Sequence, residues 1–196
     1  MIKRKKFVWL LVGCWLGTAF VSVAQANFDD GVAAYDQGDY ETALWEFKTL
    51  AEEGNVGAQT MLGVMYEGGL GVLQNYNEAV MWYRKAAKQG NARAQTNLGV
   101  MYKYGQGLRP DFKQAIEWYR MAAEQGYAAA QSKLGTMYYG NLGVPQDYVL
   151  AHMWWSIAAA QGYKNAIKDR DYVARQMTRE QIAEAQKLAR EWKPNN

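Results

Sequence analysis

The sequence predicts an all-α protein, built as a solenoid of stacked helix-turn-helix repeats of 36 residues with capping helices at both ends. Two observations predict this class. Residues of the same type recur at a spacing of 36, beginning with Gly54, Gly90, Gly126 and Gly162. Between these glycines, the apolar residues follow the three-to-four-residue spacing of an amphipathic helix. One such hairpin cannot bury its apolar face alone, so we expect the units to stack.

The N-terminus has the three parts of a secretory signal. Four basic residues at positions 3–6 precede an uncharged apolar run over residues 7–23, and Ala24-Gln25-Ala26 has the small-x-small pattern of a cleavage site. We therefore predict that residues 1–26 are a cleaved signal peptide and that the protein is exported. The periplasm is the expected location, with secretion or attachment to the envelope as alternatives.

Two other fates of this segment stay open. The apolar run is about 17 residues long, which is marginal for a bilayer span, so it could be retained as an anchor. Leu11-Val12-Gly13-Cys14 also fits a lipoprotein cleavage box, with lipidation at Cys14. If the signal is cleaved, we expect no stable membrane insertion of the mature chain.

Cleavage changes the charge of the protein. The full chain has 22 basic and 19 acidic residues, a formal net charge of +3. Without its four N-terminal basic residues, the chain keeps 18 basic residues against 19 acidic ones. The mature composition therefore gives no reason to expect a nucleic-acid partner. Cys14 is the only cysteine, which excludes an internal disulfide framework.

Residues 27–54 predict a shorter N-terminal hairpin. Its turn is Gly38-Asp39-Tyr40, and Ala43 and Phe47 follow at helical spacing. This unit holds eight acidic residues and one basic residue. The rest of the chain has a net positive charge, so the N-terminal cap is distinctly acidic.

Residues 55–90, 91–126 and 127–162 predict three full repeats. In each unit a first helix ends in a glycine-rich stretch, and Asn75, Asp111 or Asp147 then caps a second helix. The recurring positions that define the scaffold are Leu62, Leu98 and Leu134; Gly63, Gly99 and Gly135; Tyr66, Tyr102 and Tyr138; Gly71, Gly107 and Gly143; and Trp82, Trp118 and Trp154.

Residues 163–196 predict C-terminal capping helices. The repeat pattern fades here, because Arg170 and Asp171 replace the expected leucine and glycine. Thr178 and Gln181 have the spacing of a capping box and begin a final helix that extends to Trp192.

The pattern from Ala58 through Leu62-Gly63, Tyr66, Trp82-Tyr83 and Ala86-Ala87 to Gly90 resembles the Sel-one-like repeat, a relative of the tetratricopeptide repeat. The resemblance covers residues 55–162, and residues 28–54 resemble an ordinary tetratricopeptide hairpin. It implies a right-handed α-solenoid that binds proteins or peptides, often in the bacterial envelope. Some secreted, cysteine-rich members are described as penicillin-binding proteins or weak β-lactamases, but the mature chain here has no cysteine.

A helical wheel places one stripe of each first helix opposite its core face. The family resemblance implies that this stripe lines the concave groove of the solenoid. We expect an extended peptide or a partner helix there, with Arg93 and Lys103 pairing to a carboxylate; ordinary solvated charges are the alternative. The predicted groove residues are Thr60, Val64, Glu67, Arg93, Thr96, Val100, Lys103, Ser132, Thr136 and Tyr139.

The sequence offers little for catalysis, so we predict no catalytic, metal or cofactor site. His152 is the only histidine, and Val80 and Ile116 at its repeat-equivalent positions predict a partly buried substitute for an aliphatic side chain. Neither mature serine, Ser132 or Ser156, lies in a known nucleophile motif.

The predicted function is a non-catalytic protein- or peptide-interaction module of the periplasm or envelope. Two alternatives stay open: an envelope enzyme or penicillin-binding protein by family analogy, and a secreted effector that binds a host protein. Neither the partner nor the oligomeric state follows from the sequence.

Overall fold

The computed structural model describes residues 28–195, and the predicted signal peptide and Cys14 lie outside this range. Within it the chain forms helices and loops and no strand, which confirms the all-α prediction. The helices cover residues 28–37, α2 Tyr40–Glu52, α3 Val56–Gly68, α4 Tyr76–Lys88, α5 Ala92–Tyr104, α6 Phe112–Glu124, α7 Ala128–Tyr139, α8 Tyr148–Ala160, α9 Lys164–Ala174 and α10 Arg179–Glu191.

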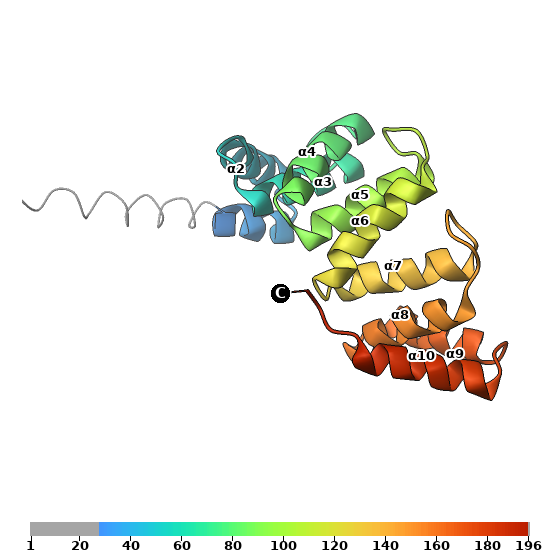
Figure 1. The fold of residues 1–196 in the computed structure, drawn as a ribbon. Helices are drawn as coiled ribbons and strands as arrows, with labels where there is room; N and C mark the ends of the chain where they lie inside the picture. The colour runs from blue at the N-terminus through green and yellow to red at the C-terminus, as the bar shows by residue number, and fades with distance from the viewer. Residues whose placement is uncertain (1–27, 196) are drawn as a thin grey trace, which may run out of the picture.

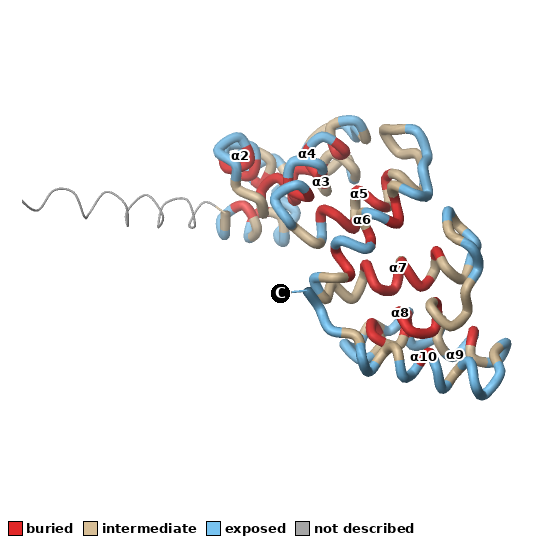
Figure 2. The backbone as a smooth tube through the Cα atoms, in the orientation of Figure 1, coloured by how far each residue is buried: buried red, intermediate tan, exposed pale blue. Residues whose placement is uncertain are grey.

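The helices stack as a solenoid of hairpins (Figure 1). The three full repeats are the pairs α3–α4, α5–α6 and α7–α8, and each second helix packs against both its own first helix and the first helix of the next unit. Buried residues run along the helices where neighbours meet, while the loops and the outer sides of α9 and α10 are largely exposed (Figure 2). The core is therefore continuous along the array, as stacking of incomplete units requires.

The recurring glycine of the first helix sets the distance between the two helices of a repeat. At Gly99, a methyl group would lie 2.6 Å from the ring of Tyr119 in the facing helix. Gly63 meets Tyr83 and Gly135 meets Trp155 in the same way. The absence of a side chain at these positions lets a large aromatic ring pack directly on the helix backbone.

The scaffold leucines and the helix glycines are buried, whereas the recurring tyrosines are half-buried and the loop glycines are half-buried or exposed. Leu62, Leu98 and Leu134 are at most 1% exposed. Trp82 and Trp154 are buried, but Trp118 is only half-buried. The indole of Trp118 therefore lies at the edge of the core.

The predicted caps of the second helices are confirmed. The side chains of Asn75 and Asp111 each accept hydrogen bonds from two backbone N–H groups of the first turn, and Asp147 accepts one from Leu150. The glycine-rich loops connect the two helices of a unit and pack against the preceding unit. Gly107 has a φ of +70° and lies against the Tyr76 carbonyl of the preceding repeat, a position with no room for a side chain.

A buried glutamine joins each unit to the one before it, which the sequence analysis did not predict. Gln95 is 1% exposed, and its amide donates to the Ala87 carbonyl at 3.1 Å while its side-chain oxygen accepts from Gln125 at 2.8 Å. The same arrangement recurs in the units before and after. Gln59 donates to Ala51 and accepts from Gln89, and Gln131 donates to Ala123 and accepts from Gln161. Each buried amide is thus satisfied on both its donor and acceptor sides.

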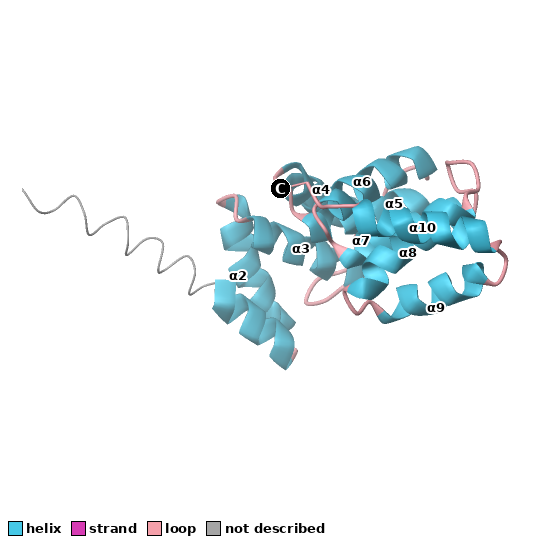
Figure 3. Ribbon diagram, turned by 60° about the horizontal axis from the view of Figure 1, so that its bottom comes forward, coloured by secondary structure: helices cyan, strands magenta, loops and turns pink. Residues whose placement is uncertain are grey.

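The two ends of the array differ. At the N-terminus, Phe28 and Phe47 pack together at 5.7 Å between ring centroids and cover the side of α3. At the C-terminus, α9 and α10 both pack against α8 and scarcely touch each other (Figure 3). The Thr178–Gln181 capping box of α10 is present as predicted. None of the helices in residues 28–195 has the length and apolar character needed to cross a membrane.

Candidate functional site

The predicted groove stripe is more buried than its place on a single helix implies. Thr60, Thr96 and Ser132 are 3%, 5% and 6% exposed. The hydroxyls of Thr60 and Thr96 donate to the carbonyls four residues earlier, at 2.9 and 2.7 Å. The prediction that these three side chains face a partner is therefore wrong, because they are buried in the folded array and the two threonine hydroxyls bond to their own helices.

Three further predicted residues, Val64, Val100 and Thr136, are half-buried. Glu67 is also half-buried, and it accepts a hydrogen bond of 2.6 Å from the hydroxyl of Tyr83. Burial, and then this carboxylate, raise the pKa of Tyr83. Glu67 thus holds α3 against α4 rather than projecting freely.

The cations of the stripe remain accessible. Arg93 on α5 is exposed and reaches back to α3, where its guanidinium lies 3.8 Å from the sulfur of Met61. Lys103, at the other end of α5, is half-buried and lies over the ring of Tyr104 at 5.1 Å. We call the surface formed by Arg93, Lys103 and Tyr139 the first-helix face.

Tyr139 belongs to an aromatic cluster that the sequence analysis did not predict. Its ring stacks on Tyr148 at 5.6 Å, and Trp155 and Tyr172 lie 5.8 and 6.1 Å away. Gln176 donates to the Tyr139 hydroxyl at 3.4 Å. Tyr172 is 56% exposed, so it presents an aromatic ring to solvent beside Tyr139.

A separate cleft lies at the C-terminal end of the array, between α8, α9 and α10, with a volume of about 820 Å³. Its apolar wall includes Ile157, Ile182 and Trp192. The ring of Trp192 contacts Trp154 edge-on at 5.9 Å, which anchors the end of α10. None of the predicted groove residues lines this cleft.

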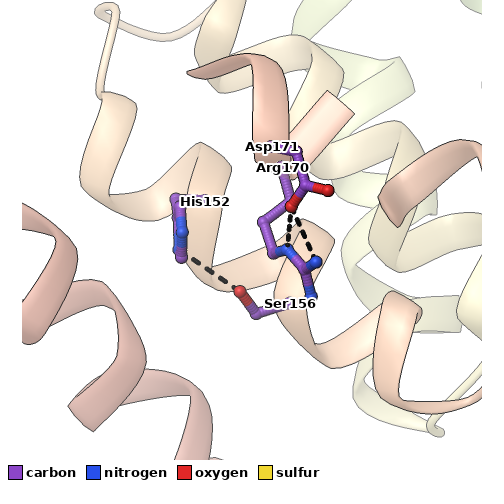
Figure 4. Close-up of polar contacts among 4 residues, drawn as sticks. All are labelled: His152, Ser156, Arg170 and Asp171. Atoms are coloured by element: carbon purple, nitrogen blue, oxygen red, sulfur yellow. Dashed lines mark hydrogen bonds and ion pairs between the residues drawn. The ribbon is translucent and has the colours of Figure 1, made fainter. Parts of the chain in front are cut away.

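Four polar side chains gather at the cleft (Figure 4). His152 and Ser156 lie one turn apart on α8, with the Ser156 hydroxyl 3.2 Å from Nδ1 of His152. On α9, Arg170 donates from both Nε and Nη2 to one oxygen of Asp171, at 2.9 and 2.7 Å. Burial, and then the charge of Arg170, lower the pKa of His152, while Asp171 acts in the opposite direction.

This arrangement differs from a hydrolase triad. Ser156 contacts Nδ1 of His152, and the nearby carboxylate of Asp171 pairs with Arg170 instead of orienting the imidazole. Over residues 28–195, no three histidine, cysteine or acidic side chains come together as a metal site would need. The four residues can instead donate and accept hydrogen bonds to a bound molecule.

The Sel1 repeat model matches residues 56–91, 92–127 and 128–163. The chain belongs to the Sel1 repeat family. Each matched unit begins one residue after the boundary expected from the glycine spacing. Sel1 repeat proteins generally mediate protein–protein interactions and are typically non-catalytic.

Two solved Sel1-type structures are similar to this chain. One is a Sel1 repeat protein from Oxalobacter formigenes, with 38% identity, a TM-score of 0.68, and coverage of 73% of this chain and 59% of that one. The other is c5321, a protective antigen of uropathogenic Escherichia coli with an SLR fold. It has 31% identity, a TM-score of 0.60, and coverage of 85% of this chain and 44% of that one. This chain therefore spans about half the length of those proteins. No curated protein sequence matches it.

The Sel1 pattern ends where the cleft begins. Arg170 and Asp171 occupy the positions of Leu134 and Gly135 one repeat later. A second helix packs on the leucine and glycine of each full Sel1 repeat, but α10 does not pack on Arg170 and Asp171. The cleft therefore lies where the regular repeat would place its second helix.

Proposed function

We propose that this Sel1 repeat protein is a non-catalytic interaction module of the periplasm or cell envelope, and that its first-helix face binds an extended peptide or a partner helix. One observation carries the proposal. The scaffold positions repeat identically, whereas the accessible positions of the stripe differ between units: Gly57, Arg93 and Ala129 are equivalent, and so are Glu67, Lys103 and Tyr139. A surface that varies on a constant scaffold can recognise one partner and reject others.

The chemistry of this face favours a partner with a carboxylate and an apolar side chain. Arg93 is exposed and has no ion pair within residues 28–195, and Lys103 adds a second cation on α5. Tyr139 and the exposed ring of Tyr172 lie one and two first helices further along the array. An acidic residue at the cations and an aliphatic or aromatic residue at Tyr172 would engage both parts.

An affinity capture from envelope extract tests the proposal. The protein is compared with Arg93→Ala/Lys103→Ala and with a control, Lys113→Ala/Arg120→Ala, which removes the same charge from exposed positions of α6. We expect a protein retained by the wild type and the control and lost with the first variant. The captured protein's affinity is then measured directly, with Tyr172→Ala as a third variant. Equal affinity for all variants would refute the role of this face.

Export is the second part of the proposal, and it rests on the basic, apolar and small-residue segments of residues 1–26. Fractionation of cells and the intact mass of the protein test it. A chain that begins at Asn27 in the periplasmic fraction is the expected result. A full-length chain or one lipidated at Cys14 in the membrane fraction would replace cleavage by anchoring, and a full-length chain in the cytoplasm would refute export.

A further inference from the structure

We propose that the cleft between α8, α9 and α10 binds a small carboxylate with an apolar body, and that Arg170 pairs with the carboxylate. This site is separate from the first-helix face, because the two share no residue. The proposal for this cleft is therefore tested independently of the proposed function.

The first argument is a coordinated departure from the repeat on α8. In the inner repeats, the helix positions equivalent to His152, Ser156 and Ala160 hold Val80, Arg84 and Lys88, and then Ile116, Arg120 and Glu124. The charged residues of the last two positions are thus replaced by small, uncharged ones only where this surface borders the cleft. Loss of charge along one line of a helix produces a wall that an apolar molecule can contact.

The second argument is the departure on α9. A cap that only covered the core would keep an apolar residue opposite α8, but α9 has Arg170 and Asp171 at the leucine and glycine positions. Their ion pair directs the guanidinium without using all of its donors, since only Nε and Nη2 are bonded to Asp171. The side chain of Arg170 is 33% exposed, so the remaining donors are accessible from the cleft.

The third argument is the buried imidazole. His152 is only 3% exposed, yet it lines the cleft, and its single hydrogen bond among the residues that the structure describes is the one to Ser156. If Ser156 donates to Nδ1, the neutral imidazole has its proton on Nε2 and can donate there. Nε2 is not among the fully buried polar atoms that lack a partner, so it reaches the cleft and can bond to a molecule there.

Charge and shape then select the ligand class. Arg170 and Arg190 outnumber Asp171 among the charged residues of the cleft, so an anion is favoured over a cation. Arginine binds carboxylates through parallel hydrogen bonds, and Ile157, Ile182 and Trp192 offer an apolar surface beside it. The end of the chain closes one side, because the backbone N–H of Asn195 donates to the Glu124 carbonyl at 2.7 Å and Pro194 lines the cleft. A fatty acid and the apolar C-terminus of a peptide share this chemistry.

Calorimetric titration of the full chain tests the proposal with two probes. One is decanoate, and the other is an acetylated tripeptide of valine, leucine and phenylalanine with a free carboxylate, compared with its amide. We expect saturable binding of at least one carboxylate probe and at least tenfold weaker binding of the amide. Binding of decanoate alone assigns a lipid-derived acid, and binding of the peptide acid assigns a chain terminus. Binding of neither probe would overturn the proposal.

Matched variants locate the site. Arg170→Gln should weaken binding at least tenfold, whereas Arg175→Gln, an exposed arginine directly after the same helix, should leave it within twofold. Ala160→Phe should fill the cleft and abolish binding, whereas Ala183→Phe on the exposed side of α10 should not. Equal effects within either pair would place the ligand elsewhere and overturn the assignment. Because all four positions tolerate solvent, helical content serves as the check on folding.

Discussion

Two equivalent first-helix positions differ between the inner repeats and the C-terminal unit: they are buried packing positions in the former and border a cleft in the latter. In α5, Leu98 and Gly99 are fully buried, and the glycine receives the ring of Tyr119 from the second helix. In α9, the equivalent Arg170 and Asp171 form an ion pair that borders a cleft. The second helix of that unit, α10, packs on α8 instead.

This difference shows what the repeat pattern encodes. Where the 36-residue pattern holds, it determines helix packing, and the leucine and glycine of each first helix are buried and unavailable to a ligand. Where the pattern breaks, polar groups become accessible while the chain still folds, and such local exceptions are expected to mark functional sites. The variable positions of the first-helix face and the polar residues of the cleft are both exceptions of this kind.

The largest expected effect comes from moving the C-terminal pair into an inner repeat. Leu98→Arg/Gly99→Asp places two charges at fully buried positions and drives a side chain into Tyr119. The loss of unfolding free energy should be roughly 5 kcal/mol or more, since buried charge and overpacking add. Chemical denaturation followed by circular dichroism measures it. A free energy of unfolding within about 1 kcal/mol of the wild type would show that the inner repeats tolerate charge at these positions and would contradict this difference between the units.

The next effect concerns the glutamines that join the inner repeats. Gln95→Ala removes two hydrogen bonds and leaves a cavity at the junction of α4, α5 and α6, which should cost about 2–3 kcal/mol. Gln114→Ala is the control, because its amide bonds only to Glu117 at the exposed surface of α6. That variant should stay within about 0.5 kcal/mol of the wild type in the same denaturation experiment. Equal losses for both would mean that the junction amides do not stabilise the stacking.

A smaller effect distinguishes the C-terminal unit by pH. The pKa of His152 is lowered in the folded protein, so the unfolded chain binds its proton more readily. Stability should therefore fall as the pH drops below the ordinary histidine pKa of about 6.5, before the carboxylates titrate. His152→Gln should show a flatter dependence between about pH 6.5 and 5. Identical slopes for wild type and variant in that window would contradict the lowered pKa.

The sequence predicts the scaffold well because the residues that define each repeat pack against residues of the same hairpin. Leu98, Gly99 and the cap Asp111 act through neighbours in the same hairpin, so their spacing is enough to place them. His152 is as buried as Val80 and Ile116, more completely than the partial burial predicted from the repeat. The recurring glutamines also follow the 36-residue spacing, but their burial is not predicted by the spacing of the apolar residues.

The site is less predictable because it depends on contacts between units. A helical wheel of α5 places Thr96 opposite the core face of that helix, but in the folded array Thr96 is only 5% exposed. Likewise, the sequence shows that Arg170 and Asp171 break the pattern, yet the cleft exists only because α10 packs on α8. The exposed ring of Tyr172 follows from the same geometry, since it reaches Tyr139 from another unit.

A variant that returns leucine to position 170 and removes the ion pair tests most directly whether Arg170 and Asp171 serve a ligand. Arg170→Leu/Asp171→Ala is measured for both unfolding free energy and binding of the carboxylate probe. If Arg170 and Asp171 depart from the repeat because they bind a ligand, binding of the probe should be abolished. The free energy of unfolding should stay within about 1 kcal/mol of the wild type, because only a partly exposed ion pair is lost. A large loss of stability with unchanged binding would show that these residues serve the cap alone, and would contradict the account.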